Sequence, residues 1–208
     1  MSIRGLIFDF GGVIMDMRWD VARRLEREHG LERRGIFRTL YDSHEWSEIR
    51  LGRGDVEAWR QSAHRRLEEG AGRPLPALHQ WWRESWGLIQ ENLDLIRSVK
   101  PTHRTAILSN ADATLEERLR DGPGIYELFD AVIASAAVGL AKPDHRIYRL
   151  AADRLGLPAD ECVFVDDAEP NVTAAREVGM AAVHYRVDRG HNLAAQLADL
   201  GVRAGVVG

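Results

Sequence analysis

The chain has 208 residues and a formal net charge of −4, with acidic and basic residues interspersed along it. That length suits one α/β core with an inserted subdomain, and that charge pattern argues against nucleic-acid and membrane partners. The single cysteine, Cys162, rules out an intrachain disulfide, and the apolar start is too short for a signal peptide. We therefore expect a cytoplasmic protein.

Five short apolar runs predict buried strands, at residues 3–8, 105–108, 131–134, 162–165 and 181–185. Helical patterns separate these runs, and helical crossovers between strands build a parallel sheet with helices on both faces. The expected fold is a three-layer α/β/α sandwich, Rossmann-like and doubly wound, with five or six parallel strands.

The stretch from residue 17 to residue 86 has a different pattern, because it contains no β-rich run and reads as several amphipathic helices broken by Gly and Pro. Asp55 is a candidate N-cap for a helix over 56–69. All six tryptophans lie in this stretch, and we expect most of them to form its own core. The predicted organisation is an α/β core of residues 1–16 and 87–208, with a helical cap of residues 17–86 inserted after the first strand.

Polar side chains directly follow four of the predicted strands: Asp9, Ser109, Ser135 and the pair Asp166-Asp167. Ligands of such sheets bind at the carboxyl ends of the strands. We therefore expect three carboxylates and two hydroxyls to gather at one edge of the sheet. Asp9 with two following glycines could also be a simple strand-ending turn, so the case depends on the segments taken together.

Four segments carry the chemistry: FDFGGV at 8–13, AILSN at 106–110, GLAKP at 139–143 and FVDD at 164–167. FDFGGV, AILSN and FVDD each lie at the end of a predicted strand, and GLAKP runs into a predicted helix. Their order and content resemble the four motifs of the haloacid dehalogenase-like hydrolase superfamily, in its phosphatase-type branch with an inserted helical cap. The resemblance extends over residues 3–185 apart from the cap, whose sequence matches nothing in the motifs.

The resemblance implies a nucleophile and a metal. Asp9 would attack phosphorus and form an aspartyl-phosphate. Mg²⁺ would be held by the Asp9 carboxylate, the Gly11 carbonyl and Asp167. Asp166 would join this coordination or orient the metal's waters. Adjacent carboxylates at a buried strand end repel each other unless a cation lies between them, which favours metal binding.

The resemblance also implies a phosphate site. The Ser109 hydroxyl and the backbone amides of Phe10, Gly11 and Asn110 would donate hydrogen bonds to phosphate oxygens. Lys142 would bridge the nucleophile and the phosphate, and it is one of only two lysines among 28 basic residues. A compact ammonium fits between two anions where a guanidinium fork does not. Asn171 has two equal interpretations, a hydrogen bond to the carboxylates or a role in starting its helix.

Position 11 departs from the family pattern, in which phosphatases usually carry a second aspartate two residues after the nucleophile. Gly11 keeps the backbone carbonyl but removes a general acid, which is worth roughly 10²–10⁴ in rate. Three function classes stay open. They are a phosphatase for a small organic phosphate with a good leaving group, such as a sugar 1-phosphate, a metal-independent 2-haloacid dehalogenase, and a weakly active or non-catalytic phospho-ligand binding protein. We expect a monomer or a homodimer.

Overall fold

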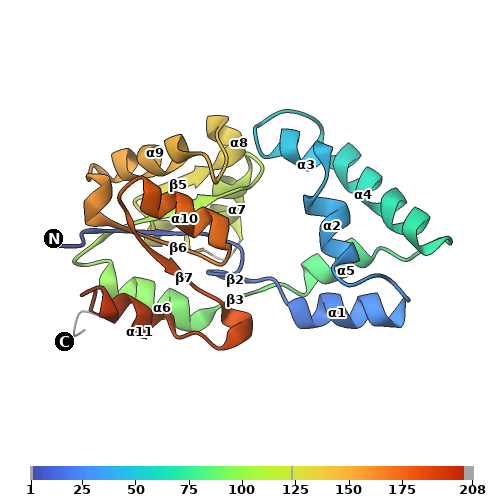
Figure 1. Ribbon diagram of the computed structural model, residues 1–208, viewed down its shortest axis with the longest axis horizontal. Helices are drawn as coiled ribbons and strands as arrows, with labels where there is room; N and C mark the ends of the chain where they lie inside the picture. Colours follow the sequence, from blue (N-terminus) through green and yellow to red (C-terminus); the bar gives the residue numbers. More distant parts are fainter. Residues whose placement is uncertain (1, 123, 204–208) are drawn as a thin grey trace.

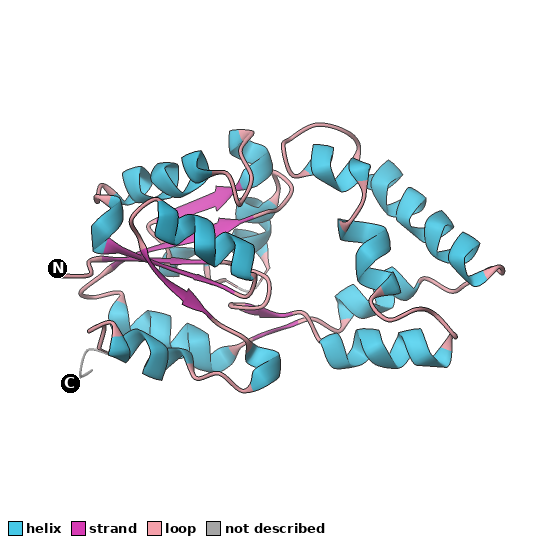
Figure 2. Ribbon diagram, viewed as in Figure 1, coloured by secondary structure: helices cyan, strands magenta, loops and turns pink. Residues whose placement is uncertain are grey.

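The computed structural model describes residues 2–122 and 124–203, which form an α/β part and an all-helical part (Figure 1, Figure 2). Residues 1, 123 and 204–208 of the predicted core lie outside the described residues. The first and last described residues both lie in the α/β part, and the chain crosses to the helical part and back once (Figure 1).

The α/β part contains a parallel sheet in the order β5-β4-β1-β6-β7. Its strands are β1 (Gly5–Phe8), β4 (Arg104–Ser109), β5 (Ala131–Ala134), β6 (Cys162–Asp166) and β7 (Ala181–His184). Each lies on one of the five predicted runs, and the doubly wound parallel sheet is confirmed. The order of strands in the sheet places β1 in the centre, so its carboxyl end lies between those of β4 and β6.

Alternate residues of β1 enter two different cores, which explains the three layers. Leu6 and Phe8 pack on one face of the sheet, and Ile7 packs on the other. All three are fully buried, and burying one such side chain contributes about 1.5–3 kcal/mol. The helices of the α/β part are α6 (Gln90–Val99), α7 (Leu115–Asp121), α8 (Ser135–Val138), α9 (His145–Leu155), α10 (Glu169–Glu177) and α11 (Leu193–Asp199).

The two faces carry different helices. Leu93 of α6 and Leu197 of α11 share the core of Leu6 and Phe8, while α9 and α10 cover the face of Ile7 (Figure 1). The described residues of this part also form three short 3-10 helices, η1 (Tyr126–Leu128), η2 (Ala159–Glu161) and η3 (Val187–Arg189). The α/β/α layering therefore follows from the period-two pattern of the central strand.

The helical part comprises α1 (Trp19–Glu28), α2 (Gly35–Tyr41), α3 (His44–Ile49), α4 (Val56–Ala71) and α5 (Leu78–Glu84). It has a hydrophobic core of its own, in which Trp59 and Trp82 are buried. The N-cap predicted at Asp55 is confirmed, because its carboxylate accepts from the amides of Glu57 and Ala58 at 2.8 and 2.9 Å. We call residues 17–86 the cap from here on.

A small antiparallel ladder joins the two crossings between the parts. It pairs β2 (Met15–Asp16) with β3 (Gly87–Leu88). The ladder lies directly at the predicted boundaries 16/17 and 86/87, which remain a prediction as domain limits. Within residues 2–122 and 124–203, no helix combines the length and apolarity needed to cross a membrane.

Candidate active site

Two neighbouring strand ends bring three carboxylates together. β1 and β6 pair in register, and the Asp9 amide donates to the Val165 carbonyl at 2.8 Å. Asp9 therefore lies beside the end of β6, where Asp166 and Asp167 follow. One carboxylate oxygen from each of the three aspartates lies within 4.8 Å of the others. The gathering predicted at the sheet edge is present for these residues.

Lys142 lies between two of these carboxylates. Its Nζ is 2.8 Å from Asp9 Oδ1 and 2.6 Å from Asp166 Oδ2, and the residue is only 2% exposed. Burial acts to lower the pKa of Lys142, but the two carboxylates outweigh burial and raise it. The lysine is therefore a fixed cation, and three carboxylates with one ammonium leave a formal charge of −3 + 1 = −2.

The net negative charge of the cluster contributes to raised pKa values at two of the aspartates. Burial, followed by repulsion from Asp166, raises the pKa of Asp9 to about 6 despite the opposing effect of Lys142. Burial and the charges of Asp9 and Asp166 raise the pKa of Asp167 to about 7. A divalent cation at the three carboxylates would cancel the formal charge and restore both ionised forms. An all-oxygen donor set also suits Mg²⁺, so these residues fit that ion.

Asp166 is held by hydrogen bonds within the protein. Its Oδ1 accepts from the Ala168 amide at 2.8 Å, and the Asn171 amide group donates to both carboxylate oxygens at 3.2 and 3.0 Å. Of the two interpretations of Asn171, the hydrogen bond to a carboxylate is the one present. Asp166 thus has both oxygens engaged, which suits fixing Lys142 and orienting a metal's waters better than direct coordination.

Ser109 and Asn110 end β4 beside the carboxylates, and they differ in what they contact. Ser109 is buried and lines the cavity described below. Its hydroxyl makes no hydrogen bond with any of the described residues. The Asn110 side chain clasps the Lys142 backbone, accepting from its amide at 2.9 Å and donating to its carbonyl at 3.0 Å. Sequence reasoning missed this clasp. An amide side chain that matches one backbone donor and one acceptor was its only signal.

Ser135, the fifth strand-end residue, does not reach the cavity. It is fully buried, and its hydroxyl accepts from the Ala111 amide at 3.1 Å. Ser135 therefore supports the loop that follows Asn110. The strand-end rule identified its position correctly, but its hydroxyl is hydrogen-bonded to the Ala111 backbone and does not line the cavity.

The turn after Asp9 assigns different roles to its two glycines. Gly12 has φ +79°, and a Cβ there would lie 2.6 Å from Asp167 Oδ2, so only glycine fits. Gly11 has no positive φ, and its Cβ would meet Met17 Sδ at 3.4 Å, an ordinary contact. The Phe10 amide donates to Asp9 Oδ1 at 2.7 Å. The backbone conformation at position 11 would therefore also permit an aspartate there.

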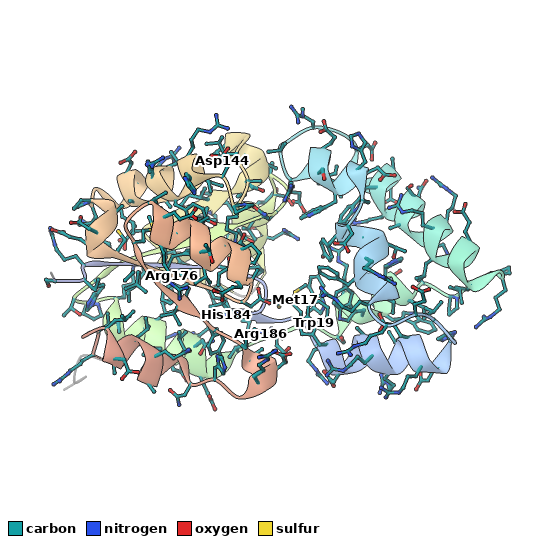
Figure 3. All side chains as sticks on the ribbon, in the orientation of Figure 1. Met17, Trp19, Asp144, Arg176, His184 and Arg186 are labelled. Carbon is teal, nitrogen blue, oxygen red and sulfur yellow. The ribbon has the colours of Figure 1, made fainter. Side chains whose placement is uncertain are left out.

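A cavity of about 690 Å³ lies between the carboxylate cluster and the cap. Its core side includes the predicted residues Asp9, Phe10, Gly11, Ser109, Asn110, Lys142 and Asp167. Its cap side is largely aromatic and basic, with Trp19, Tyr41, Trp46, Arg60, Arg83 and Trp86, and it also includes Glu26 and Asp42. Figure 3 shows Met17 and Trp19 where the chain enters the cap, with His184 and Arg186 beside them on the core side.

His184 also belongs to this site and was not predicted. It ends β7, its Nε2 lies 2.9 Å from the Asp167 carbonyl, and its Nδ1 lies 2.7 Å from Glu169 Oε2. Both ring nitrogens are engaged, so the imidazole holds the loop that carries Asp167. The strand-end rule missed His184 because the predicted run of residues 181–185 extended past it, whereas β7 ends at His184.

Comparisons with known proteins identify the family of this chain. A model of the haloacid dehalogenase-like hydrolase family matches residues 3–179. A sesquiterpene phosphatase from Aspergillus oryzae is 28% identical over 187 residues, which make up 88% of this chain and 90% of that protein.

Two solved structures share the fold. A HAD family enzyme from Bacteroides thetaiotaomicron, in complex with magnesium and inorganic phosphate, has a TM-score of 0.69 at 18% identity, covering 94% of this chain and 99% of that one. The L-2-haloacid dehalogenase from Xanthobacter autotrophicus, with chloropropionic acid covalently bound, has a TM-score of 0.61 at 22% identity, covering 87% and 76%. At these identities both likenesses concern the fold alone. With the family match over most of its length, this chain belongs to the haloacid dehalogenase-like hydrolases.

Proposed function

We propose that this protein is a Mg²⁺-dependent phosphomonoesterase that hydrolyses a small organic phosphate through an aspartyl-phosphate on Asp9. The observation that carries the proposal is the charge arrangement at the end of β1. Asp9 faces the cavity, Lys142 Nζ holds it at 2.8 Å, and the three-carboxylate cluster keeps a formal charge of −2. That charge matches a divalent cation, and a phosphate dianion needs such a cation beside a carboxylate nucleophile.

The residues divide the work of phosphoryl transfer. Asp9 is the nucleophile, and Lys142 keeps it ionised and oriented while screening the incoming phosphate. Ser109 donates its unengaged hydroxyl to a phosphate oxygen, with the amides of Phe10, Gly11 and Asn110 as further donors. The Phe10 amide, which donates to Asp9 Oδ1, would have to exchange that acceptor.

Asp9, the Gly11 carbonyl and Asp167 would hold Mg²⁺, with Asp166 orienting its waters. When bound, Mg²⁺ supplies charge neutralisation between the nucleophile and the phosphate oxygens. His184 and Asn171 would hold these ligands in position, because His184 contacts the Asp167 carbonyl and Asn171 donates to the Asp166 carboxylate.

The dehalogenase alternative fits the charges less well. A haloacid substrate is itself a carboxylate, and without a metal it would meet three further carboxylates balanced by one lysine. A non-catalytic binding protein would not need a buried lysine that joins the proposed nucleophile to a second carboxylate. The Aspergillus relative is a phosphatase, and the Bacteroides enzyme of the same fold binds magnesium and inorganic phosphate. Both lend support to the phosphatase.

The absence of a side chain at Gly11 limits the range of substrates that the protein can hydrolyse well. The position two residues after Asp9 offers no proton donor, and Met17 Sδ lies close to where a Cβ would be. The leaving oxygen therefore departs with less help, which favours phosphates whose leaving group is already stable as an anion. Sugar 1-phosphates, acyl phosphates and aryl phosphates meet that condition, and a sugar 1-phosphate is the physiological possibility that we propose.

The test is a pair of assays on the same preparation. Phosphate release from an aryl phosphate should require Mg²⁺, stop with a chelator and return with added Mg²⁺. Ca²⁺ should bind without good turnover, because its looser coordination misplaces the in-line geometry. Full phosphatase activity in chelator would contradict the proposed mechanism, and metal-independent halide release from 2-chloropropionate would favour the dehalogenase.

A further inference from the structure

The cap end of the cavity carries three arginines from three different elements. Arg60 lies on α4, Arg83 on α5 and Arg118 on α7, and all three line the cavity. Arg60 and Arg83 belong to the cap, whereas Arg118 belongs to the core. Arg60 and Arg83 are partly buried, whereas Arg118 and the other arginines on the cap side of the cavity, Arg23, Arg33 and Arg34, are exposed to solvent.

The three arginines have too few acidic partners. Arg118 is 3.6 Å from Asp112, and Arg60 is 3.9 Å from Glu57, a distance at the limit of an ion pair. Within residues 2–122 and 124–203, no carboxylate lies within 4.0 Å of Arg83. The Arg60 Nε–H is buried and has no acceptor among these residues. The cluster therefore contains guanidinium donors that nothing in the described protein accepts from.

The surroundings make this excess of positive charge costly. Arg83 is half-buried, and its guanidinium lies 5.8 Å from the ring centre of Trp86. Burial, together with repulsion from Arg60 and Arg118, lowers the pKa of Arg83, against the smaller opposing effects of Tyr41 and Asp112. Aromatic side chains form the adjoining wall, and they exclude water and strengthen any electrostatic interaction made there. A guanidinium has five donors and no acceptor, so only an acceptor group can relieve it.

We propose that the substrate carries a second anionic group, a carboxylate or a further phosphate, which Arg60 and Arg83 bind with help from Arg118. The scissile phosphate would lie at Asp9, so this inference rests on the proposed phosphatase function. A cavity of about 690 Å³ holds a small molecule with one charged group at each end. Carboxylates and phosphates are the groups that guanidinium forks bind bidentately.

The position of the arginines adds a second consequence. An anion between Arg118 of the core and Arg60 and Arg83 of the cap offsets their mutual repulsion across the opening of the cavity. Binding of the second anionic group therefore favours the arrangement in which cap and core face each other closely. The cap thus selects the substrate and closes over it through the same contacts.

The test compares a phenyl phosphate bearing a meta-carboxylate with the near-isosteric meta-carboxamide. The measured quantity is the ratio of their kcat/KM values. The unmodified protein should prefer the carboxylate by about 10- to 100-fold, the range expected for hydrogen bonds to a charged group in a water-poor site. Arg83→Gln and Arg60→Gln should each bring the ratio towards one, mainly through KM of the carboxylate. Arg65→Gln, an exposed arginine of α4 that does not line the cavity, should leave it unchanged.

A binding measurement separates this inference from the phosphatase function. Calorimetry with the carboxylate compound and the Asp9→Asn variant should give a dissociation constant that Arg83→Gln raises about tenfold or more. If neither compound is hydrolysed but this weakening is seen, the anion site holds and the phosphatase proposal fails. If both are hydrolysed without preference, or if the variants slow both equally, the anion site is wrong. If binding is insensitive to Arg83 and there is no turnover, both proposals are wrong.

Discussion

The two ends of the cavity handle charge in opposite ways. At the core end, Lys142 is buried between Asp9 and Asp166, and the excess charge is negative. At the cap end, Arg60 and Arg83 are half-buried without adequate partners, and the excess charge is positive. The first end attracts a metal cation and the second attracts an anion. One cavity can therefore hold a cation-bound phosphate at one end and fix the rest of the substrate at the other.

The difference also separates chemistry from selection. Core residues follow strand ends, so their positions are fixed by a five-stranded sheet whose strands pair in register. Cap residues project from helices that have their own core and join the sheet through two short strands. Replacements at the core end should therefore change whether reaction occurs. Replacements at the cap end should change which substrate reacts.

Asp9→Asn should produce the largest effect. Removing the nucleophile should lower turnover by roughly 10⁴-fold or more. The free energy of unfolding should stay within about 1 kcal/mol of the unmodified protein, because the shape is kept and Lys142 retains Asp166. Initial rates and urea unfolding curves provide the two readouts. Substantial turnover in this variant would show that another residue attacks phosphorus.

Lys142→Met should affect the core end through stability as well as activity. It leaves two buried carboxylates without their cation, which should cost about 3–5 kcal/mol in metal-free protein. Lys100→Met is the matched control, since Lys100 is partly exposed and 3.5 Å from Asp130 and should cost less than about 1 kcal/mol. Equal costs in chemical unfolding would mean that the buried ion network does not stabilise the fold.

Gly11 sets the third expected effect. Across a series of aryl phosphates, the rate should fall steeply as the pKa of the leaving group rises, because charge builds up on the departing oxygen. Gly11→Asp should flatten this dependence and raise the rates of the poorest substrates by up to roughly 10²-fold. The backbone at position 11 permits a side chain, and only the flexible end of Met17 would have to adjust.

Gly12 provides the control for that experiment. Gly12→Ala should impair activity and Mg²⁺ binding, because its Cβ would collide with Asp167 and its φ is positive. A flat leaving-group series in the unmodified protein, with the chemical step shown to limit the rate, would mean that another residue donates the proton. That residue would then have to be sought on the cap.

The smallest predicted effect is a pH dependence. The folded-state pKa values of Asp9 and Asp167, about 6 and about 7, lie above the ordinary value of 3.8. Between the ordinary value of 3.8 and these raised values, the folded protein therefore binds more protons than the unfolded protein. Without metal, stability should accordingly fall as the pH rises from about 4 to about 7. Mg²⁺ binding releases those protons, so its affinity should rise by at least about tenfold per pH unit between pH 5 and pH 6.

Thermal unfolding with and without Mg²⁺ measures this dependence. The increase in Tm caused by Mg²⁺ should be small at pH 5 and large at pH 7.5. Asp167→Asn should reduce the increase at pH 7.5, whereas Asp144→Asn, at a partly exposed helix N-cap, should leave it unchanged. A metal effect that does not vary with pH would mean that these two carboxylates do not bind the ion.

The sequence was sufficient for the core end and insufficient for the cap end, for a physical reason. Asp9, Ser109 and Asp167 follow apolar runs, and the carboxyl ends of parallel strands meet at one edge whatever the details of packing. Helical periodicity shows which face of a helix is apolar, but not which neighbouring helix that face meets. The approach of Arg60 on α4 to Arg83 on α5 depends on that tertiary contact.

The tryptophans illustrate the same limit. Trp59 and Trp82 are buried in the core of the cap, as expected for most of the six. Trp19, Trp46 and Trp86 are only partly buried and line the cavity, which the buried Trp59 also lines, and Trp81 is 46% exposed. Composition indicated that tryptophans form a core in the cap. Which tryptophans lie in that core, in the cavity wall or at the surface depends on how the helices pack, which the sequence does not show.

The most direct measurement of the central claim is the chemical state of Asp9 during turnover. Protein mixed with substrate and Mg²⁺, quenched in acid within one turnover and reduced with borohydride, should carry homoserine at position 9, the product expected from an aspartyl-phosphate. Mass spectrometry of the peptide that contains Asp9 should detect this change only when substrate and Mg²⁺ are both present. An unmodified Asp9 in protein that is demonstrably releasing phosphate under the same conditions would contradict the account.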